Sequence, residues 1–148
     1  EESFRTPLMV RWTGRVAPGK VNNRDLVSNL DFAETFLDVA GAPIPDDMQG
    51  KSLVPILEGN SPADWRKTHY YHYYEAGGHG VPIHFGVTDG RFKLIRFPDP
   101  KLDAWEFYDL DNDPLELESL FEDETISEEQ HRMMQELEKL RDTFKIEE

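Results

Sequence analysis

Histidines are concentrated between residues 69 and 84, where four of the five in the chain lie beside Glu75. They are His69, His72, His79 and His84. Imidazole nitrogens and carboxylate oxygens are common metal ligands, so a metal site is one chemistry that these side chains allow. The spacing matches no standard site, and His69 and His72 would face opposite sides of a strand. We therefore expect no metal here.

Ligand recognition is the second chemistry that these histidines allow. His79 lies within the glycine-rich run Gly77–Gly80, and His84 precedes a strand-like segment. A loop held by a rigid scaffold commonly presents polar side chains to a ligand. We expect His84, and after it His79, to be substrate-binding candidates. The alternative is that His84 only hydrogen-bonds a neighbouring carbonyl within the sheet.

Other reactive groups are scarce. The chain has no cysteine, which excludes a disulfide, a thiolate metal site and a thiol nucleophile. The run Asp109–Asp113 resembles the start of a calcium loop, but Pro114 stands where the loop needs glycine and Leu120 where it needs glutamate. An Asx turn is the better interpretation. Strand alternation divides the cations between two faces, so we expect solvated positions for Arg91, Lys93 and Arg96.

Charge is distributed unevenly. The formal net charge is -14, and most of it comes from residues 109–148, which contain 15 acidic and 4 basic residues. A basic stripe for nucleic acid is absent from the sequence, so we expect no nucleic-acid partner. No apolar run approaches the roughly 20 residues of a membrane helix, so we expect no membrane span.

Residues 1–68 have the pattern of an incomplete α/β domain. Residues 7–12 are mostly apolar and predict a buried strand. A capping box of Asp31 and Glu34 predicts a helix that ends at Gly41, and Ser28 is an alternative cap that would start this helix one turn earlier. Residues 42–68 are rich in turn-forming residues and predict a crossing loop. A strand and a helix are half of a βαβ unit, which needs neighbouring strands. Because the chain also opens on Glu1 without a methionine, we expect a piece of a longer protein.

Residues 69–148 predict a small α+β subdomain. Strands are expected at 69–74, on both sides of an Asp89-Gly90 turn within 85–97, and at 105–110. A helix capped by Ser127 should cover this sheet of about four antiparallel strands with one apolar face, formed by Met133, Leu137, Leu140 and Phe144. The predicted fold class is thus an α/β fragment followed by an α+β subdomain.

Four segments in order carry a family resemblance. They are EESFRTPLMVRWTGRVAPG, SNLDFAETFLDVAGAPIPDDMQGKSLVPIL, HFGVTDGRFKLIRF and WEFYDLDNDPLELESL. Together they resemble the C-terminal part of the sulfatases of the alkaline-phosphatase superfamily, of the arylsulfatase or glycosaminoglycan type. The chain departs from the family pattern at Thr13 and Glu34, where proline is usual, and at Thr88, where arginine is common.

The resemblance implies a parent enzyme that hydrolyses sulfate esters, with sulfated carbohydrates as substrates. Such enzymes use a formylglycine nucleophile, made from a C-x-P-x-R or S-x-P-x-R signature that does not occur in this chain, and a calcium ion whose ligands would lie mostly before Glu1. The chain itself should therefore contain no catalytic residue or metal ligand and should be inactive alone. Its implied partners are the N-terminal catalytic domain and a sulfated sugar gripped by His84 and His79, and the implied location is periplasmic or secreted. Two alternatives stay open, a non-catalytic binding or structural module and a related phosphodiesterase or phosphonate hydrolase.

Overall fold

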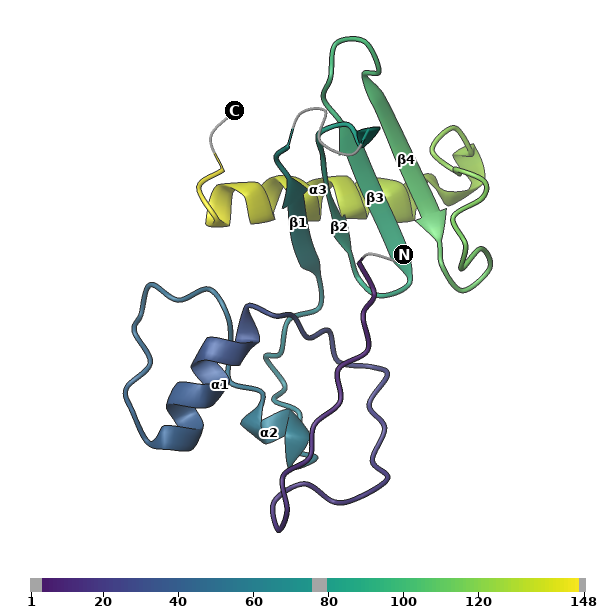
Figure 1. The fold of residues 1–148 in the computed structure, drawn as a ribbon. Coiled ribbons are helices and arrows are strands. Elements are labelled where there is room, and N and C mark those ends of the chain that lie inside the picture. The colour runs from purple at the N-terminus through teal and green to yellow at the C-terminus, as the bar shows by residue number, and fades with distance from the viewer. Residues whose placement is uncertain (1–3, 76–79, 147–148) are drawn as a thin grey trace. The chain divides into compact units, whose positions relative to one another are not determined.

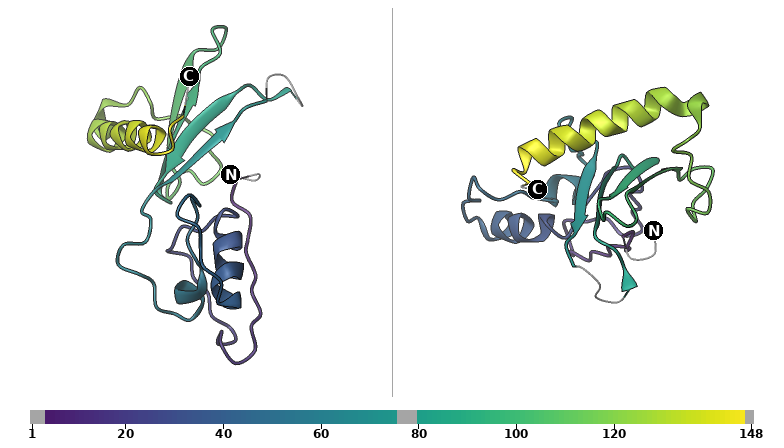
Figure 2. Two further views of the ribbon diagram at one scale, coloured as in Figure 1. Left: turned by 90° about the vertical axis from the view of Figure 1, so that its left-hand side faces the viewer. Right: turned by 90° about the horizontal axis from the view of Figure 1, so that it is seen from above.

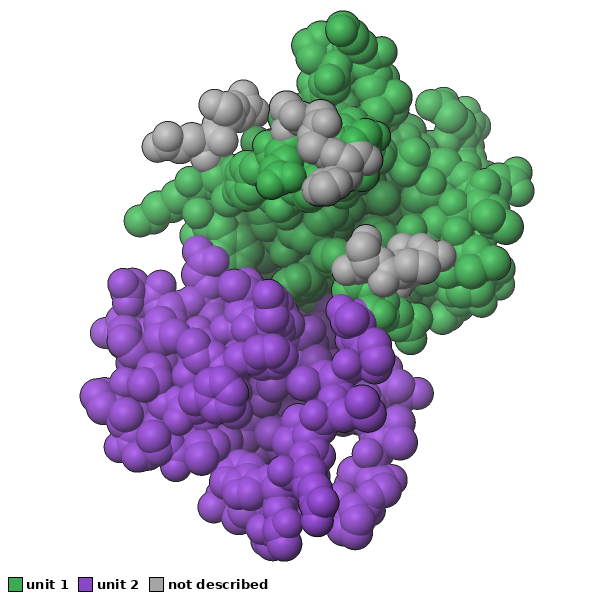
Figure 3. Space-filling view, in the orientation of Figure 1, with its two compact units in different colours: residues 1–5, 68–148 green, residues 6–67 purple. Residues whose placement is uncertain are grey.

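The computed structural model describes residues 4–75 and 80–146. The chain divides into two compact units, shown in different colours in Figure 3. We call Thr6–Lys67 the N-terminal unit, and Glu1–Arg5 with Thr68–Glu148 the sheet unit. None of the helices within the described ranges combines the length and the apolar character that crossing a membrane requires.

The sheet unit contains a four-stranded antiparallel sheet (Figure 1). Its strands follow the chain order, β1 (His69–Tyr73), β2 (His84–Thr88), β3 (Phe92–Phe97) and β4 (Ala104–Asp109). The 3₁₀-helix η2 (Glu124–Ile126) leads into the helix α3 (Ser127–Thr143), which lies across one face of the sheet (Figure 2). The predicted small antiparallel sheet with a C-terminal helix is confirmed.

The predicted apolar face of α3 forms the core of this unit. Met133 and Leu137 are buried against the sheet residues Phe85, Val87, Phe92, Leu94 and Phe107, and Leu140 packs at the edge of this cluster. The ring of Phe144 lies 6.1 Å from that of Tyr70. The predicted Ser127 cap is wrong, because Ser127 is already the first helical residue and no side chain caps α3. Asp123 instead accepts a hydrogen bond from the Thr125 N–H at the start of η2.

The β2–β3 turn lies one residue further along than predicted. The Asp89 N–H donates to the Phe92 carbonyl over 3.1 Å, so Gly90 and Arg91 are the two central residues. Gly90 has a φ of 94°, which suits a glycine in the first central position of a type II′ hairpin turn. The Asp89 carboxylate accepts hydrogen bonds from the N–H groups of Arg91 and Phe92 and holds the turn closed.

The N-terminal unit has two helices, α1 (Asp31–Ala40) and the short α2 (Val54–Leu57), and a small apolar cluster of Leu53, Ile56 and Trp65. α1 ends as predicted at Gly41, which has a φ of 68°. The predicted strand at residues 7–12 is wrong for this chain, since these residues form no strand and Leu8, Met9 and Val10 are exposed. A strand needs a neighbour to pair its backbone groups, and among residues 4–75 and 80–146 no strand is paired with this segment.

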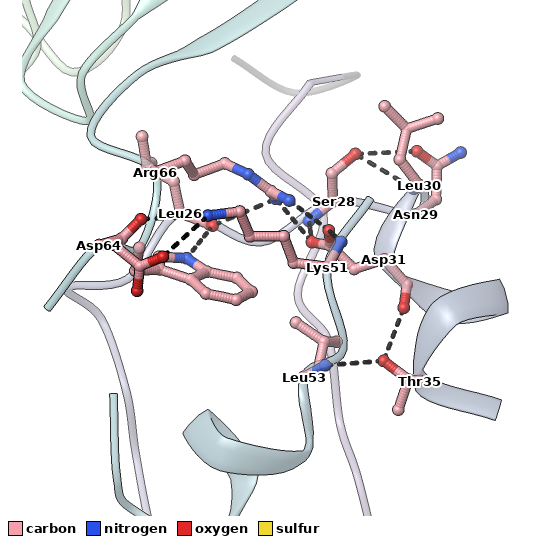
Figure 4. Close-up of polar contacts among 11 residues, drawn as sticks. Leu26, Ser28, Asn29, Leu30, Asp31, Thr35, Lys51, Leu53, Asp64 and Arg66 are labelled. Carbon is pink, nitrogen blue, oxygen red and sulfur yellow. Dashed lines mark hydrogen bonds and ion pairs between the residues drawn. The ribbon is translucent and has the colours of Figure 1, made fainter. Parts of the chain in front are cut away.

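Asp31 joins three segments of the N-terminal unit (Figure 4). It is the first residue of α1 and does not act as the predicted helix cap. Its fully buried carboxylate accepts hydrogen bonds from the N–H groups of Ser28 (2.8 Å) and Lys51 (2.9 Å) and pairs with both terminal nitrogens of Arg66, one of them at 2.6 Å. The helix start, the segment at residue 51 and the segment at residue 66 therefore meet at one side chain.

The packing of α3 on the sheet predicts that substitutions of two neighbouring residues differ strongly in their effect on the free energy of unfolding. Leu137 is 2% exposed, so Leu137→Asp buries a charge without a partner and should lower the free energy of unfolding by several kcal/mol. Glu138 is exposed, and Glu138→Lys should change it by about 0.5 kcal/mol or less. Urea unfolding measures both, and equal midpoints would contradict the docking.

The Asp31 network predicts a pH dependence of stability. Burial alone would raise the pKa of Asp31, but hydrogen bonds from Arg66, Lys51 and Ser28 outweigh it and lower this pKa below its ordinary value. A lowered folded-state pKa stabilises the fold above the unfolded-state pKa of about 3.9, and this stability is lost as the pH falls through the folded-state pKa.

Asp31→Asn should therefore lower the free energy of unfolding by about 3 kcal/mol at pH 7. Below about pH 4 the variant should lose less stability with falling pH than the wild type. Asp64→Asn is the matched control, because its carboxylate is exposed and lies 3.8 Å from Lys51 Nζ. Unfolding measured between pH 3 and 7 should show little change for the control. Identical pH profiles for the two variants would argue against the network.

Candidate functional site

His84 lies at the end of the β2–β3 hairpin that is furthest from the turn. It is the first residue of β2 and stands opposite Tyr73 in β1. Phe85 and Val87 of the same strand are buried in the core cluster that contains Met133 and Leu137 of α3. Because side chains alternate along a strand, His84 lies on the other face of the sheet.

Aromatic side chains fix the His84 imidazole. Its ring centroid lies 5.4 Å from Tyr73 in a stacked arrangement, 5.6 Å from Tyr71 in an edge arrangement and 5.5 Å from Phe97. Gly86 makes room for this packing, since a Cβ there would lie 3.0 Å from a carbon of the Tyr71 ring and would overlap the carbonyl oxygen of Leu94. The ring is therefore held by three aromatic neighbours.

The two nitrogens of His84 have different surroundings. Nδ1 lies 2.9 Å from the carbonyl oxygen of Pro82, and since a carbonyl only accepts, Nδ1 is the donor. This is the carbonyl contact that the sequence analysis offered as an alternative to ligand binding. It occupies one nitrogen, and Nε2 has no hydrogen-bond partner among residues 4–75 and 80–146. In the neutral ring Nε2 is then an acceptor that could meet a hydroxyl, and in the charged ring it is a donor that could meet a sulfate oxygen.

His69 and His72, the two other histidines between residues 69 and 84 that the structure describes, do not gather around His84. His79 lies outside the described residues. His72 is on the α3 side of the sheet, where its Nδ1 lies 3.1 Å from the Tyr70 hydroxyl and its ring stacks on Tyr74. Burial, followed by the positive charge of Arg141, lowers the pKa of His72.

His69 lies on the opposite face of β1 from His72, with its ring 5.8 Å from that of Phe4. Within the part of the chain that the structure describes, no three His, Cys, Asp or Glu side chains are grouped to hold a metal ion.

Lys93 is a buried charge that the sequence analysis missed. It was expected in solvent, but it is 4% exposed, and its Nζ lies 2.7 Å from Glu116 Oε1. The Nζ also lies 5.2 Å from the centre of the Phe4 ring. Residues 92–95 of β3 are buried on both faces of the strand, and the apolar Ile95 on the same face as Lys93 is the sequence signal for this.

Lys93 and His84 belong to different parts of the sheet. Lys93 pairs with Thr88 beside the turn, four residues along β2 from His84. Four residues of strand span about 13 Å. The Lys93 Nζ lies 6.0 Å from the centre of the Tyr71 ring, which also borders His84, but its charge is paired with Glu116.

The run that resembles a calcium loop forms the predicted Asx turn. The Asp109 carboxylate accepts hydrogen bonds from the Asp111 N–H (3.2 Å) and the Asn112 side chain (2.8 Å), and Arg91 binds both of its oxygens at 3.0 and 2.8 Å. The Arg91 hydrogen bonds are the main reason why the pKa of Asp109 is lowered. Its oxygens are thus already engaged within the fold.

Comparison with known proteins defines the class of this chain. The model of the family N-sulphoglucosamine sulphohydrolase, C-terminal, matches residues 1–143. The chain therefore belongs to this family and is the C-terminal part of a sulfatase.

Individual relatives agree with this assignment. The chain is 43% identical over 148 residues to N-acetylglucosamine-6-O-sulfatase of Bacteroides thetaiotaomicron, a match that covers 98% of this chain and 26% of that protein. It is 33% identical over 98 residues to human arylsulfatase A, covering 66% of this chain and 18% of that protein. The chain thus spans about a quarter of the length of the first of these relatives.

Solved structures share the fold. The structure of BT4656 in complex with its substrate D-glucosamine-2-N,6-O-disulfate matches with a TM-score of 0.74 and 46% identity, covering 78% of this chain and 24% of that chain. The phosphonate monoester hydrolase of Silicibacter pomeroyi matches with a TM-score of 0.62 over 75% of this chain and 24% of that chain, at 22% identity, which shows a common fold alone.

Proposed function

We propose that the chain is the C-terminal portion of an enzyme that hydrolyses sulfate esters of carbohydrates, with sulfated glucosamine as the substrate class. The observation that carries this proposal is the 43% identity to an N-acetylglucosamine-6-O-sulfatase across 98% of the chain. The 46% identity to a protein whose substrate is a disulfated glucosamine supports the same substrate class. A phosphonate hydrolase is less favoured, since that relative is only 22% identical.

The reaction centre is proposed to lie in an N-terminal catalytic domain of the same polypeptide. The chain has no cysteine that could become formylglycine, and neither nucleophile signature occurs in it. The two carboxylates with the most hydrogen bonds, Asp31 and Asp109, are each paired with an arginine and do not suit a calcium ion. We assign the formylglycine and the calcium that the family implies to the catalytic domain.

The two parts of the chain are proposed to have different roles. Residues 1–68 would be the end of the catalytic α/β domain with its crossing loop. Residues 69–148 would be a small subdomain that shapes the substrate cleft. His84 supports this division, because the sheet holds its ring rigidly while Nε2 is left for a ligand. His79 is proposed as a second sugar contact from the loop before β2.

The first test compares the chain with the complete protein. Incubated with glucosamine 6-sulfate or an aryl sulfate, the complete protein should release sulfate, and the 148-residue chain should release none with or without calcium. A covalent nucleophile is needed to divide the reaction into two steps, and the chain has no group of that kind in place. The proposal would be refuted if the 148-residue chain released sulfate and a point substitution within the chain abolished that activity.

The second test concerns His84 in the complete protein. If Nε2 contacts the sugar or the sulfate, His84→Ala should lower kcat/KM on a sulfated oligosaccharide by about 10-fold to 100-fold, or roughly 1.4 to 2.7 kcal/mol of transition-state binding. A small aryl sulfate that does not reach His84 should be affected much less.

His131→Ala is the matched control, since His131 is exposed on α3 and its Nδ1 bonds only the Ser127 carbonyl. This control should change neither rate. If His84→Ala reduced both rates equally together with the melting temperature, His84 would be structural and the contact would be refuted.

A further inference from the structure

The Tyr71 ring lies across the sheet beside His84. Tyr71 pairs with Gly86 in β2, and a Cβ at Gly86 would lie 3.0 Å from a ring carbon and 3.1 Å from the hydroxyl oxygen of Tyr71. The ring therefore rests on the backbone of β2, where the missing side chain makes room for it. His84 is two residues away along β2 and meets this ring edge-on, with 5.6 Å between the ring centroids. The position of the Tyr71 ring thus limits where the His84 imidazole can lie.

Lys93 approaches the Tyr71 ring from the hairpin-turn end of the sheet. It pairs with Thr88, four residues along β2 from His84. The Lys93 Nζ lies 6.0 Å from the centre of the Tyr71 ring and 5.2 Å from that of Phe4. A cation within about 6 Å of an aromatic face is attracted to the ring. Phe4 packs in turn on Tyr71, with 4.4 Å between the ring centroids. The Tyr71 ring is therefore held by Phe4 and by the Lys93 cation.

Glu116 supplies a negative charge to the buried Lys93. Lys93 is 4% exposed, and Glu116 Oε1 lies 2.7 Å from its Nζ. Glu116 lies in the loop after β4 and has a φ of 55°, in the left-handed region that a glutamate rarely adopts. A strained backbone of this kind persists only where its surroundings hold it, and such residues are concentrated at functional sites. The ion pair with Lys93 is one contact that holds Glu116 in this conformation.

A buried ion pair needs an explanation other than stability. The cost of taking two charges out of water can exceed their attraction, and apolar side chains of similar volume are often as stabilising or more so. In some proteins a buried pair instead specifies one arrangement of the groups around it. The group beside the Lys93–Glu116 pair is the Tyr71 ring, and the Tyr71 ring borders His84.

We propose that the Lys93–Glu116 ion pair positions His84 for the substrate by holding the Tyr71 ring against the imidazole. This inference rests on the proposed function for the role of His84 itself. Lys93 lies about 13 Å along the sheet from His84, since four strand residues separate His84 from Thr88, with which Lys93 pairs. Lys93 and Glu116 therefore act through Tyr71 and are positioning residues.

The test removes both charges together in the complete protein, so that neither is left buried without the other. Lys93→Met/Glu116→Gln keeps side chains of nearly the same size and should lower kcat/KM on a sulfated oligosaccharide by about 3-fold to 10-fold. This loss is smaller than that for His84→Ala, because the imidazole is still present but is held less firmly. Arg132→Met is the matched control. Arg132 belongs to α3, on the other face of the sheet, and pairs with Asp89 at 2.6 Å, so its loss should change kcat/KM by less than about 2-fold.

A double-mutant cycle separates positioning from general damage to the fold. If the ion pair acts through His84, adding Lys93→Met/Glu116→Gln to His84→Ala should cause no further loss of kcat/KM. An equal loss in both backgrounds would overturn the proposal, as would a wild-type kcat/KM for Lys93→Met/Glu116→Gln. Glu116→Gln alone is the second variant if the double variant does not fold, and its rates are interpreted in the same way.

Crystal structures of the complete protein give a readout that does not need activity. In the wild type, His84 Nδ1 should keep its bond to the Pro82 carbonyl. In the variant that lacks both charges, the Tyr71 ring should shift and the His84 imidazole should leave Pro82 or occupy two conformers. Unchanged positions of both rings would overturn the proposal. If the wild-type protein releases no sulfate, the proposed function fails, and the crystal structures still decide whether the ion pair positions His84.

Discussion

The packing of α3 on one face of the sheet is the constraint that determines the candidate site. Met133 and Leu137 bury the side chains of β2, β3 and β4 that point toward the helix. Because strand residues alternate, the remaining residues of the same strands must face the other way. His84, Tyr73, Tyr71 and Phe97 are brought together on that second face, where the aromatic rings hold the imidazole. The orientation of His84 is thus a consequence of where the helix lies.

The N-terminal unit depends on a polar contact in its interior. Its interior contains the buried carboxylate of Asp31, while Met9, Phe32 and Phe36 are exposed. A buried charge adds little net stability compared with an apolar core, although losing one partner of the pair is costly. The stability of the unit therefore depends on keeping both partners of the Asp31–Arg66 pair.

Local sequence signals predicted which helices and strands form better than they predicted the residues at which these begin and end. Alternation predicted the strands, and the 3- and 4-residue spacing from Met133 to Phe144 predicted the helix that covers them. The capping box failed because the acceptor oxygens of Asp31 are engaged by Arg66, which is 35 residues away. The hairpin turn shifted by one residue because the Asp89 side chain closes it from outside the central pair.

The sequence patterns did not predict contacts between residues that are far apart in the chain. The burial of Lys93 depends on Glu116, which arrives from a loop after β4. The strand expected at residues 7–12 does not form, and a strand depends on pairing partners that the local sequence does not reveal. For the site, the sequence indicated His84 without showing that Pro82 would take one nitrogen and leave the other.

The central claim is that the sheet presents His84 Nε2 to a sulfated sugar. A crystal structure of the complete protein with glucosamine 6-sulfate bound tests it most directly. The account predicts that Nε2 lies within about 3.2 Å of a sugar hydroxyl or a sulfate oxygen, while Nδ1 keeps its bond to the Pro82 carbonyl. A ligand bound in the active site with Nε2 hydrogen-bonded to protein, and away from every atom of the sugar, would contradict it.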